Sequence, residues 1–164
     1  MAFSADIASR AEAALSAARS RGLRLACAES CTGGLVAAAL TEIPGSSDTF
    51  SGGVVSYMLD VKEHTLGVPG AVLYDPSIGA VSSECACAMA DGVAELLSAD
   101  VAVSVTGIAG PGGEEPGKPV GTVWFGLRTP EGTEAHVLCF PGNRSDVREQ
   151  ALVHALDILY GACA

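Results

Sequence analysis

The sequence predicts an α/β fold, a three-layer α/β/α sandwich with a mixed sheet, in which residues 1–164 form a single domain. Short apolar runs of strand length alternate with helix-like segments, which favours strands joined by helices on both faces of a sheet. A hairpin signal late in the chain adds antiparallel strands. No internal repeat, linker or low-complexity tract divides the 164 residues, a length that suits one domain with a substantial core.

Five elements are predicted in the first half of the chain: a helix over 6–21, a strand over 23–28, a helix over 33–43, a strand over 52–59 and a short helical segment over 61–67. In the first helix Ile7, Ala11 and Leu15 share one face, and Gly22 is a typical helix end. The two strands are apolar runs of the usual strand length. The second helix ends at the breaker pair Pro44–Gly45.

The next predicted helix follows an irregular stretch, 67–80, which is rich in proline and glycine. Ser82 or Ser83 can cap this helix, because a serine hydroxyl accepts hydrogen bonds from the first free amides of a helix. Its inward side is expected to carry the apolar residues at helical spacing, namely Ala86, Met89, Ala90, Val93, Leu96 and Leu97.

The last third of the chain is predicted to hold three strands and a helix. Residues 100–107 form a β-branched strand, followed by a glycine-rich loop over 108–119. Strand-like segments over 120–129 and 133–140 flank a short turn and indicate an antiparallel hairpin. Asn143 caps the final helix. The residues of this helix that are expected to face inward are Val147, Ala151, Ala155, Ile158 and Leu159.

Charge and hydropathy exclude several classes of partner. Nine Lys and Arg against nineteen Asp and Glu give a net charge of −10, whereas a nucleic-acid-binding protein needs a basic face to neutralise phosphates. Asp6, Arg10 and Glu12 interrupt the N-terminal segment where a signal peptide needs an apolar run. No apolar run is long enough to cross a membrane. We therefore expect a cytoplasmic protein without nucleic-acid or membrane partners.

The six cysteines are expected to be reduced thiols rather than disulfide or metal ligands. Cys85 and Cys87 are separated by one residue, which is not the C-x-x-C spacing of a zinc or redox site. Both lie in an alanine-rich helical stretch, where free cysteine behaves as a small hydrophobic residue. The sequence therefore predicts no metal site.

Three loops follow predicted strands, at residues 28–33, 58–62 and 106–119. Ligands of open α/β sheets bind beyond the carboxyl ends of strands, so these loops form a site if they share one edge. Residues 112–118, "GGEEPGK", nearly match a phosphate-binding P-loop. However, Pro119 stands where that loop has Ser or Thr, and a strand follows where it has a helix. The match does not support hydrolysis of nucleoside triphosphates.

Ser30, in the first of these loops, is a candidate nucleophile with no histidine near it in the sequence. A lysine can replace histidine as the base if burial keeps its amine uncharged. Lys118 lies in a Gly/Pro-rich loop, whereas Lys62 follows an apolar strand that can deliver it to a dry pocket; Tyr57 can relay the proton. From the residues alone, a solvated Lys62 and a half-buried structural Tyr57 remain the favoured alternative.

Several stretches closely resemble the CinA C-terminal domain family: "AESCTGG" (28–34), "PGSS" (44–47), "GGVVSY" (52–57), "GAVSSE" (79–84), and "VSVTGIAGPGG" with "KPVGTVWFGL" (103–127). The resemblance runs from about Leu23 to Leu159. Stand-alone members of that family are amidohydrolases that convert nicotinamide mononucleotide to nicotinate mononucleotide and ammonia. The resemblance therefore implies this small-molecule substrate and no metal or organic cofactor.

Carried onto this sequence, the family's nucleophile falls on Ser30, and its tyrosine and lysine fall on Tyr57 and Lys62. The asparagine that the family usually has between them is Leu59 here, so the polar contacts of that side chain are missing. The resemblance also implies a set of substrate-binding residues: Cys31, Thr32, Gly33, Gly34, Thr106, Gly107, Gly110 and Arg144.

Different parts of this set are expected to stabilise different parts of the substrate. Amides in the turn after Ser30, at the start of the helix that contains Gly33 and Gly34, can stabilise an oxyanion. Backbone amides of residues 106–111 can line the pocket. Arg144, at a helix start, is a plausible partner for the substrate phosphate.

Two alternatives stay open. Glu29, Lys62 and Cys31 resemble the triad of nitrilase-like amidases, and a helix N-terminus with Lys62 nearby can lower the pKa of the Cys31 thiol. We favour Ser30 as nucleophile and Glu29 as a structural carboxylate that accepts backbone hydrogen bonds. The alternative function is a non-catalytic pyridine-nucleotide sensor. An alanine-rich helix face is compatible with a homo-oligomer.

Overall fold

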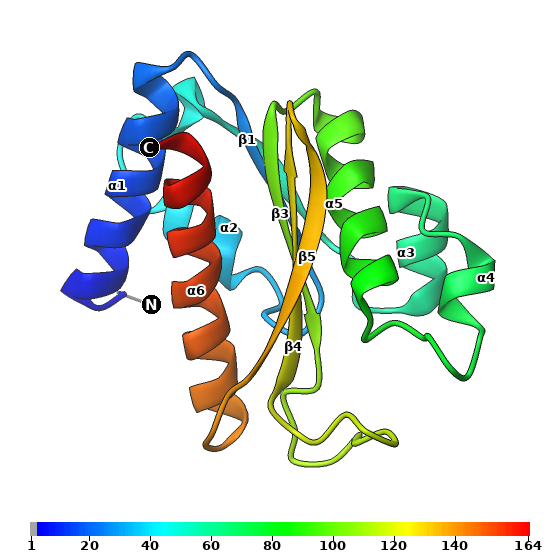
Figure 1. Cartoon of the computed structure of the whole chain (residues 1–164). Helices are drawn as coiled ribbons and strands as arrows, with labels where there is room; N and C mark the ends of the chain where they lie inside the picture. The colour runs from blue at the N-terminus through cyan, green and yellow to red at the C-terminus, as the bar shows by residue number, and fades with distance from the viewer. Residues whose placement is uncertain (1–2) are drawn as a thin grey trace.

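The computed structural model describes residues 3–164 and shows a sheet between two layers of helices (Figure 1). No helix of these residues is long and apolar enough to cross a membrane. In chain order the elements are α1 (Ala5–Ser20), β1 (Leu25–Glu29), α2 (Leu35–Thr41), the 3₁₀ turn η1 (Ser46–Asp48), β2 (Phe50–Val55), α3 (Leu59–Leu66), α4 (Gly70–Leu73), α5 (Ser83–Leu97), β3 (Val101–Gly107), β4 (Thr122–Thr129), β5 (Gly132–Cys139) and α6 (Arg144–Cys163).

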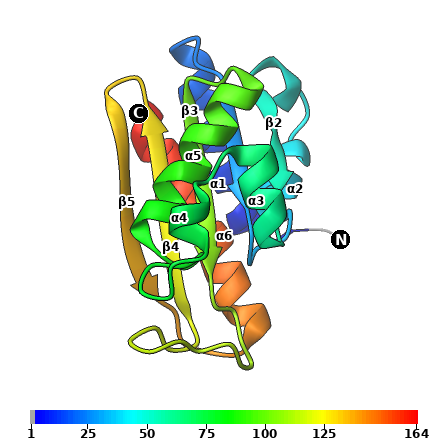
Figure 2. The ribbon, with the colours of Figure 1, turned by 90° about the vertical axis from the view of Figure 1, so that its right-hand side faces the viewer.

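The predicted three-layer sandwich with a mixed sheet is confirmed. The strand order is β2-β1-β3-β4-β5; β1 runs parallel to β2 and β3, and the pairs β3–β4 and β4–β5 are antiparallel. Helices α1, α2 and α6 cover one face of the sheet, and α3, α4 and α5 cover the other (Figures 1 and 2). The late hairpin is β4–β5, as the sequence predicts.

Small side chains let the helices approach the sheet closely. Along β1, Cys27 packs into the core on the α6 side, whereas Ala26 and Ala28 pack into the core on the α5 side. A methyl group on Gly126 of β4 would come within 2.3 Å of the Ala86 carbonyl of α5. The helices are therefore tightly packed on both faces of the sheet whose strands carry the connecting loops.

Several predicted boundaries differ from the structure. The strand predicted over 52–59 ends at Val55, because its partner β1 ends at Glu29, opposite Val55. A helix, α3, then begins at Leu59, and the irregular stretch 67–80 contains the one-turn helix α4. Leu96 does not face inward: it is 52% exposed and lies in the last turn of α5, just before the C-cap residue Ser98.

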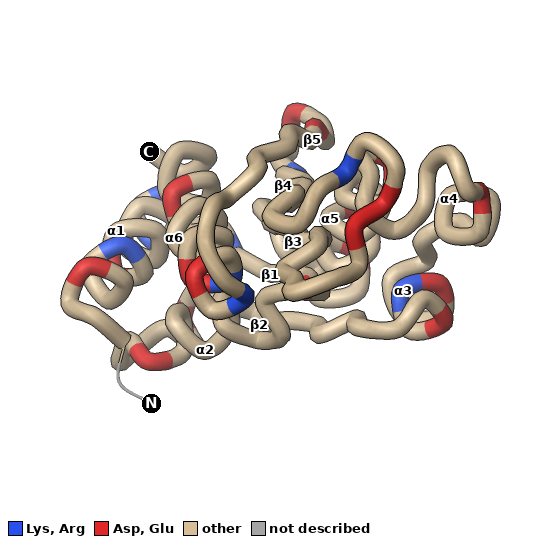
Figure 3. The backbone as a smooth tube through the Cα atoms, turned by 90° about the horizontal axis from the view of Figure 1, so that it is seen from below, with Lys and Arg blue, Asp and Glu red and all other residues tan. Residues whose placement is uncertain are grey.

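The three loops predicted to form a site do share one edge. Because β1, β2 and β3 are parallel, their carboxyl ends lie together, and the segments that follow them lie beside each other. Figure 3 views the molecule from below this edge, with the strand ends between α6 and α3. Basic residues occur on both of these helices.

Helix α3 is seated on α5 through a close approach at Gly92. A Cβ atom on Gly92 would lie 1.9 Å from the carbonyl oxygen of Leu66, the last residue of α3. Only a residue without a side chain allows this contact. The contact sets the position of α3 over the sheet, and with it the position of Lys62 on that helix.

We expect Gly92→Ala to lower the free energy of unfolding by about 1–3 kcal/mol, because α3 must move away from α5 to admit the methyl group. Urea-induced unfolding followed by circular dichroism measures the change. Gly161→Ala in α6 is the matched control, since a Cβ there meets nothing within 4 Å. An equal stability of the two variants would contradict this role of Gly92.

Candidate active site

Ser30 and Lys62, which are 32 residues apart in the sequence, meet at the carboxyl edge of the sheet. Ser30 directly follows β1, and Lys62 lies in the first half of α3. The Lys62 Nζ amine donates a hydrogen bond to Ser30 Oγ over 2.9 Å and a second one to the Ser56 carbonyl. The pairing expected from the sequence is therefore present in the fold.

The Lys62 side chain is deeply buried and has no acidic partner. The residue is only 1% exposed, and none of the ion pairs within residues 3–164 includes it. Burial lowers the pKa of the Lys62 amine, since an ammonium group loses its hydration in the protein interior. The nearby Cys85 and Cys31 thiols oppose this effect without reversing it. The site thus favours an uncharged amine beside the Ser30 hydroxyl.

The carboxylate of Glu29 holds the turn that carries Ser30. Glu29 is fully buried, and its two oxygens accept hydrogen bonds from the amides of Gly34 (2.9 Å), Val36 (3.1 Å) and Ala37 (2.9 Å). A negative group at the N-terminus of α2 satisfies amides that have no acceptor within the helix. Glu29 is thus the structural carboxylate that the sequence favours, and it is not placed as a base.

The glycine pair gives the turn its shape. Gly33 and Gly34 have φ angles of +62° and +98°, a left-handed backbone that other residues rarely adopt. The Gly33 amide donates to the Ser30 carbonyl over 3.1 Å, and the Gly34 amide donates to Glu29. Neither amide, therefore, is available to an oxyanion. Within the described chain, the amides of Cys31 and Thr32 donate no hydrogen bond to another residue.

The structure disfavours Cys31 as a nucleophile. The residue is 5% exposed, and burial raises the pKa of its thiol to about 11. Lys62 and Arg148 lower this pKa, as expected of nearby cations, but burial outweighs them. A thiol with this pKa is almost entirely protonated at neutral pH and is a poor nucleophile.

Arg148 contacts the same turn from α6 and is a residue that the sequence reasoning missed. Its Nε donates to the Cys31 carbonyl over 3.1 Å, and its Nη2 donates to the Thr32 carbonyl over 2.8 Å. One signal could have found it. Arg148 lies four residues, about one helical turn, after Arg144, and residues at this spacing share a face of the last helix.

Arg144 connects the second and third loops. Its Nη1 donates to the Gly110 carbonyl over 2.8 Å, and its Nη2 donates to the Tyr57 hydroxyl over 3.0 Å. Tyr57 is 57% exposed and bonds to Arg144 rather than to Lys62. Arg144 is the first residue of α6, as predicted. The Asn143 side chain already accepts hydrogen bonds from the amides of Ser145 and Asp146, so these two amides are not available to a ligand.

Thr106 and Gly107 belong mainly to the scaffold. The Thr106 hydroxyl donates to the Ala80 carbonyl over 2.7 Å, and the residue is 1% exposed. Gly107 allows close packing of β3 on β4, since a Cβ there would lie 2.5 Å from the Thr122 carbonyl. The two residues hold the third loop in place, and Gly110 is the member of this predicted group that contacts another site residue.

In the described residues, none of the three histidines forms a hydrogen bond with Ser30. The imidazoles of His136 and His154 contact each other, with their Nε2 atoms 2.7 Å apart, and His64 lies against the carbonyl of Asp60. Lys118 bonds to the Ile78 carbonyl and to Glu115. Within residues 3–164, no three His, Cys, Asp or Glu side chains gather in a group that could hold a metal ion.

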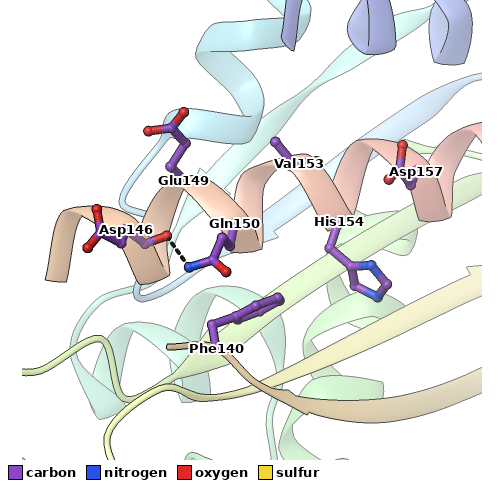
Figure 4. Close-up of a pocket in the computed structure, with 7 residues that line it drawn as sticks. All are labelled: Phe140, Asp146, Glu149, Gln150, Val153, His154 and Asp157. Carbon is purple, nitrogen blue, oxygen red and sulfur yellow. Dashed lines mark hydrogen bonds between the residues drawn. The ribbon is translucent and has the colours of Figure 1, made fainter. Parts of the chain in front are cut away.

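A groove of about 500 Å³ lies along α6 and has an acidic rim (Figure 4). Its lining residues are Phe140, Asp146, Glu149, Gln150, Val153, His154 and Asp157. None of them forms a hydrogen bond with Ser30 or Lys62. The groove and the Ser30–Lys62 pair therefore share no residue.

Comparison with known proteins identifies one family. The family model of the CinA C-terminal domain matches residues 7–163. A CinA-like protein of Desulfotalea psychrophila is 52% identical over 139 residues, which cover 85% of this chain and 33% of the relative. A putative competence-damage inducible protein of Caldanaerobacter subterraneus is 48% identical over an equal length. The chain thus spans about a third of the length of these relatives.

Solved structures agree with this match. The competence/damage inducible protein CihA of Agrobacterium tumefaciens has a TM-score of 0.93 and 39% identity, covering 99% of this chain and 98% of that one. The competence damage-inducible protein A of Klebsiella pneumoniae has a TM-score of 0.89 and 37% identity, covering 94% and 95%.

We expect Glu29→Ala to lower the free energy of unfolding by at least about 3 kcal/mol, because three amides at the start of α2 lose their acceptor. Thermal and urea unfolding measure the loss. Glu42→Ala, at the exposed C-terminal end of α2, is the matched control, with an expected change within about 0.5 kcal/mol. A loss as small for Glu29→Ala as for the control would contradict the anchoring role of Glu29.

Proposed function

Because the chain belongs to the family of the CinA C-terminal domain, we propose that it hydrolyses the carboxamide of nicotinamide mononucleotide to nicotinate mononucleotide and ammonia. One observation carries the proposal: a buried lysine amine without an acidic partner lies 2.9 Å from a serine hydroxyl. That arrangement suits a serine nucleophile with a lysine base.

The first step forms an ester between enzyme and substrate. Ser30 Oγ attacks the carboxamide carbon, and the uncharged Lys62 amine takes the hydroxyl proton. The tetrahedral intermediate then collapses, the carbon–nitrogen bond breaks, and the Lys62 ammonium returns its proton to the leaving nitrogen. Ammonia departs, and the nicotinoyl group remains on Ser30.

Water completes the reaction in the second step. Lys62, now uncharged again, removes a proton from water, which attacks the ester carbon. The carbon–oxygen bond to Ser30 breaks, and the proton passes from Lys62 to Ser30 Oγ. Because the amine must start uncharged, kcat/KM should rise with pH through the lowered pKa of Lys62.

The amides of Cys31 and Thr32 are the oxyanion donors in this proposal. The amides of Gly33 and Gly34 have acceptors within the protein, so the donor role moves to the two residues directly after Ser30. An amide fixed beside the nucleophile stabilises the negative oxygen of the tetrahedral intermediate, and loss of one such donor raises a barrier by about 2.7–4 kcal/mol.

Arg144 is proposed to bind the substrate phosphate. Its guanidinium uses two of its N–H groups on Gly110 and Tyr57 and keeps others for an anion. These two bonds fix the planar group at the mouth of the site, which prepares it for charge-assisted contacts with phosphate oxygens. No metal or organic cofactor takes part in the proposed steps.

A pyridine-nucleotide sensor without turnover is the second candidate. The observation that favours it is Leu59, which stands at the start of α3 in place of the family's asparagine and is 38% exposed. Saturable binding of nicotinamide mononucleotide in calorimetry, with no ammonia released over hours, would select this function over the hydrolase.

We expect Ser30→Ala and Lys62→Ala each to lower kcat for ammonia release from nicotinamide mononucleotide by on the order of 10⁴-fold, because nucleophile and base act as one unit. Cys31→Ser should keep most of the activity and serves as the matched control. A coupled ammonia assay measures all four proteins. Near-full activity of Ser30→Ala together with an inactive Cys31→Ser would overturn the assignment of the nucleophile.

We expect Arg144→Ala to raise KM for nicotinamide mononucleotide by about 10- to 100-fold, the effect of losing one charge-assisted contact. The same substitution should leave KM for the nucleoside, which has no phosphate, little changed. Steady-state kinetics with both substrates makes the comparison. Equal losses on the two substrates would rule out phosphate binding by Arg144.

A further inference from the structure

We propose that Arg148 is a positioning residue that aims the Thr32 amide at the oxyanion, an inference that rests on the proposed function. Arg148 lies in the second turn of α6 and reaches the nucleophile turn from the side of the sheet opposite α3. Its guanidinium donates to the carbonyls of Cys31 (3.1 Å) and Thr32 (2.8 Å), the two residues that follow Ser30.

The direction of the peptide planes carries the argument. In a trans peptide the carbonyl of one residue and the amide of the next point in opposite directions. Holding the Cys31 carbonyl toward Arg148 therefore turns the Thr32 amide away from α6. This amide donates to no other residue of the described chain, although Thr32 itself is fully buried. A buried amide without an acceptor is costly unless a ligand supplies one.

The remaining amides of the turn have partners. Ser30 donates to the Val105 carbonyl over 2.9 Å, and Gly33 donates to the Ser30 carbonyl over 3.1 Å. Gly34 donates to the Glu29 carboxylate over 2.9 Å. These bonds fix both ends of the turn and leave its centre to be oriented by the carbonyls that Arg148 holds.

The positive charge of Arg148 has a second effect. A cationic donor on a carbonyl polarises the whole peptide group and strengthens its amide as a donor. The Thr32 amide therefore meets a developing oxyanion already oriented and polarised. Arginine suits this task because its planar fork can bond two neighbouring carbonyls at once, which the single ammonium of lysine cannot reproduce.

The test is steady-state ammonia release by Arg148→Ala and Arg148→Lys. We expect kcat to fall on the order of 10²-fold in both, with KM for nicotinamide mononucleotide within about threefold of wild type, since the lost contact acts in the transition state. The lysine variant keeps the charge and most of the packing. Arg128→Ala, which removes a surface arginine paired with Asp91, is the matched control with unchanged kcat.

Two readouts separate positioning from general damage. The acid limb of the kcat/KM profile should keep its apparent pKa, because Lys62 stays buried if only the oxyanion contact is lost. Added guanidinium ion should restore part of the activity of Arg148→Ala. Any of three results would overturn the proposal. The first is a fall in kcat of less than tenfold, and the second is an acid limb that moves toward the ordinary lysine pKa. The third is a loss of activity equal to the fraction of unfolded protein measured by circular dichroism. If Arg148→Ala fails to fold, Arg148→Lys decides by the same criteria.

A separate measurement keeps the proposal testable if wild type releases no ammonia. Phenylmethylsulfonyl fluoride reacts with an activated serine: Oγ bonds to sulfur, fluoride leaves, and the base takes the proton. Intact-mass spectrometry follows this labelling, with Ser30→Ala as blank. We expect labelling to be at least tenfold slower in Arg148→Lys than in wild type. The reason is that a sulfonyl oxygen of the reagent accepts a hydrogen bond from the same Thr32 amide as the oxyanion. Equal rates in wild type and Arg148→Lys would overturn the role of Arg148. Wild-type labelling no faster than the blank would instead overturn Ser30 as an activated nucleophile, and with it the proposed function on which the role of Arg148 rests.

Discussion

The hydrogen bonds between the Glu29 carboxylate and the first amides of α2 are the interaction on which the site depends. Glu29 ends the central strand β1, and Ser30 is the next residue, so the bonds that anchor the carboxylate also fix the start of the turn. Arg148 holds the same turn through its carbonyls. A carboxylate thus accepts hydrogen bonds from amides at the start of α2, and a guanidinium donates to carbonyls of the turn, which leaves few conformations open to the backbone around Ser30.

Burial of Lys62 is the second requirement of the proposed reaction, because it lowers the pKa of the amine. Gly92 lets the two helices touch at the Leu66 carbonyl, and in this arrangement the Lys62 amine is sealed from water beside Ser30. A buried amine without an acidic partner is unfavourable for folding when it is protonated. The unfolded chain binds this proton more readily, so between the lowered pKa and the ordinary lysine value stability rises with pH.

Much of the fold could be predicted from local patterns. Helical spacing, capping residues and breakers located α1, α5 and α6, and the β-branched run and hairpin signal located β3, β4 and β5, because these signals act over a few neighbouring residues. The end of β2 could not be predicted in the same way. Residues 56–58 have strand-like composition, but β1 offers no partner beyond Glu29, so the strand stops at Val55.

For the site, the sequence by itself determined the chemical groups: a serine before a glycine pair, one lysine after an apolar strand, and an arginine at a helix start. Together with the family resemblance, it also favoured a structural role for Glu29 over that of a base. Only the tertiary structure decided the partners of Arg148 and Tyr57, and which amides of the turn remain unbonded. Those contacts join residues about 90 to 120 positions apart, and such pairs are set by how helices pack across the sheet rather than by any local pattern.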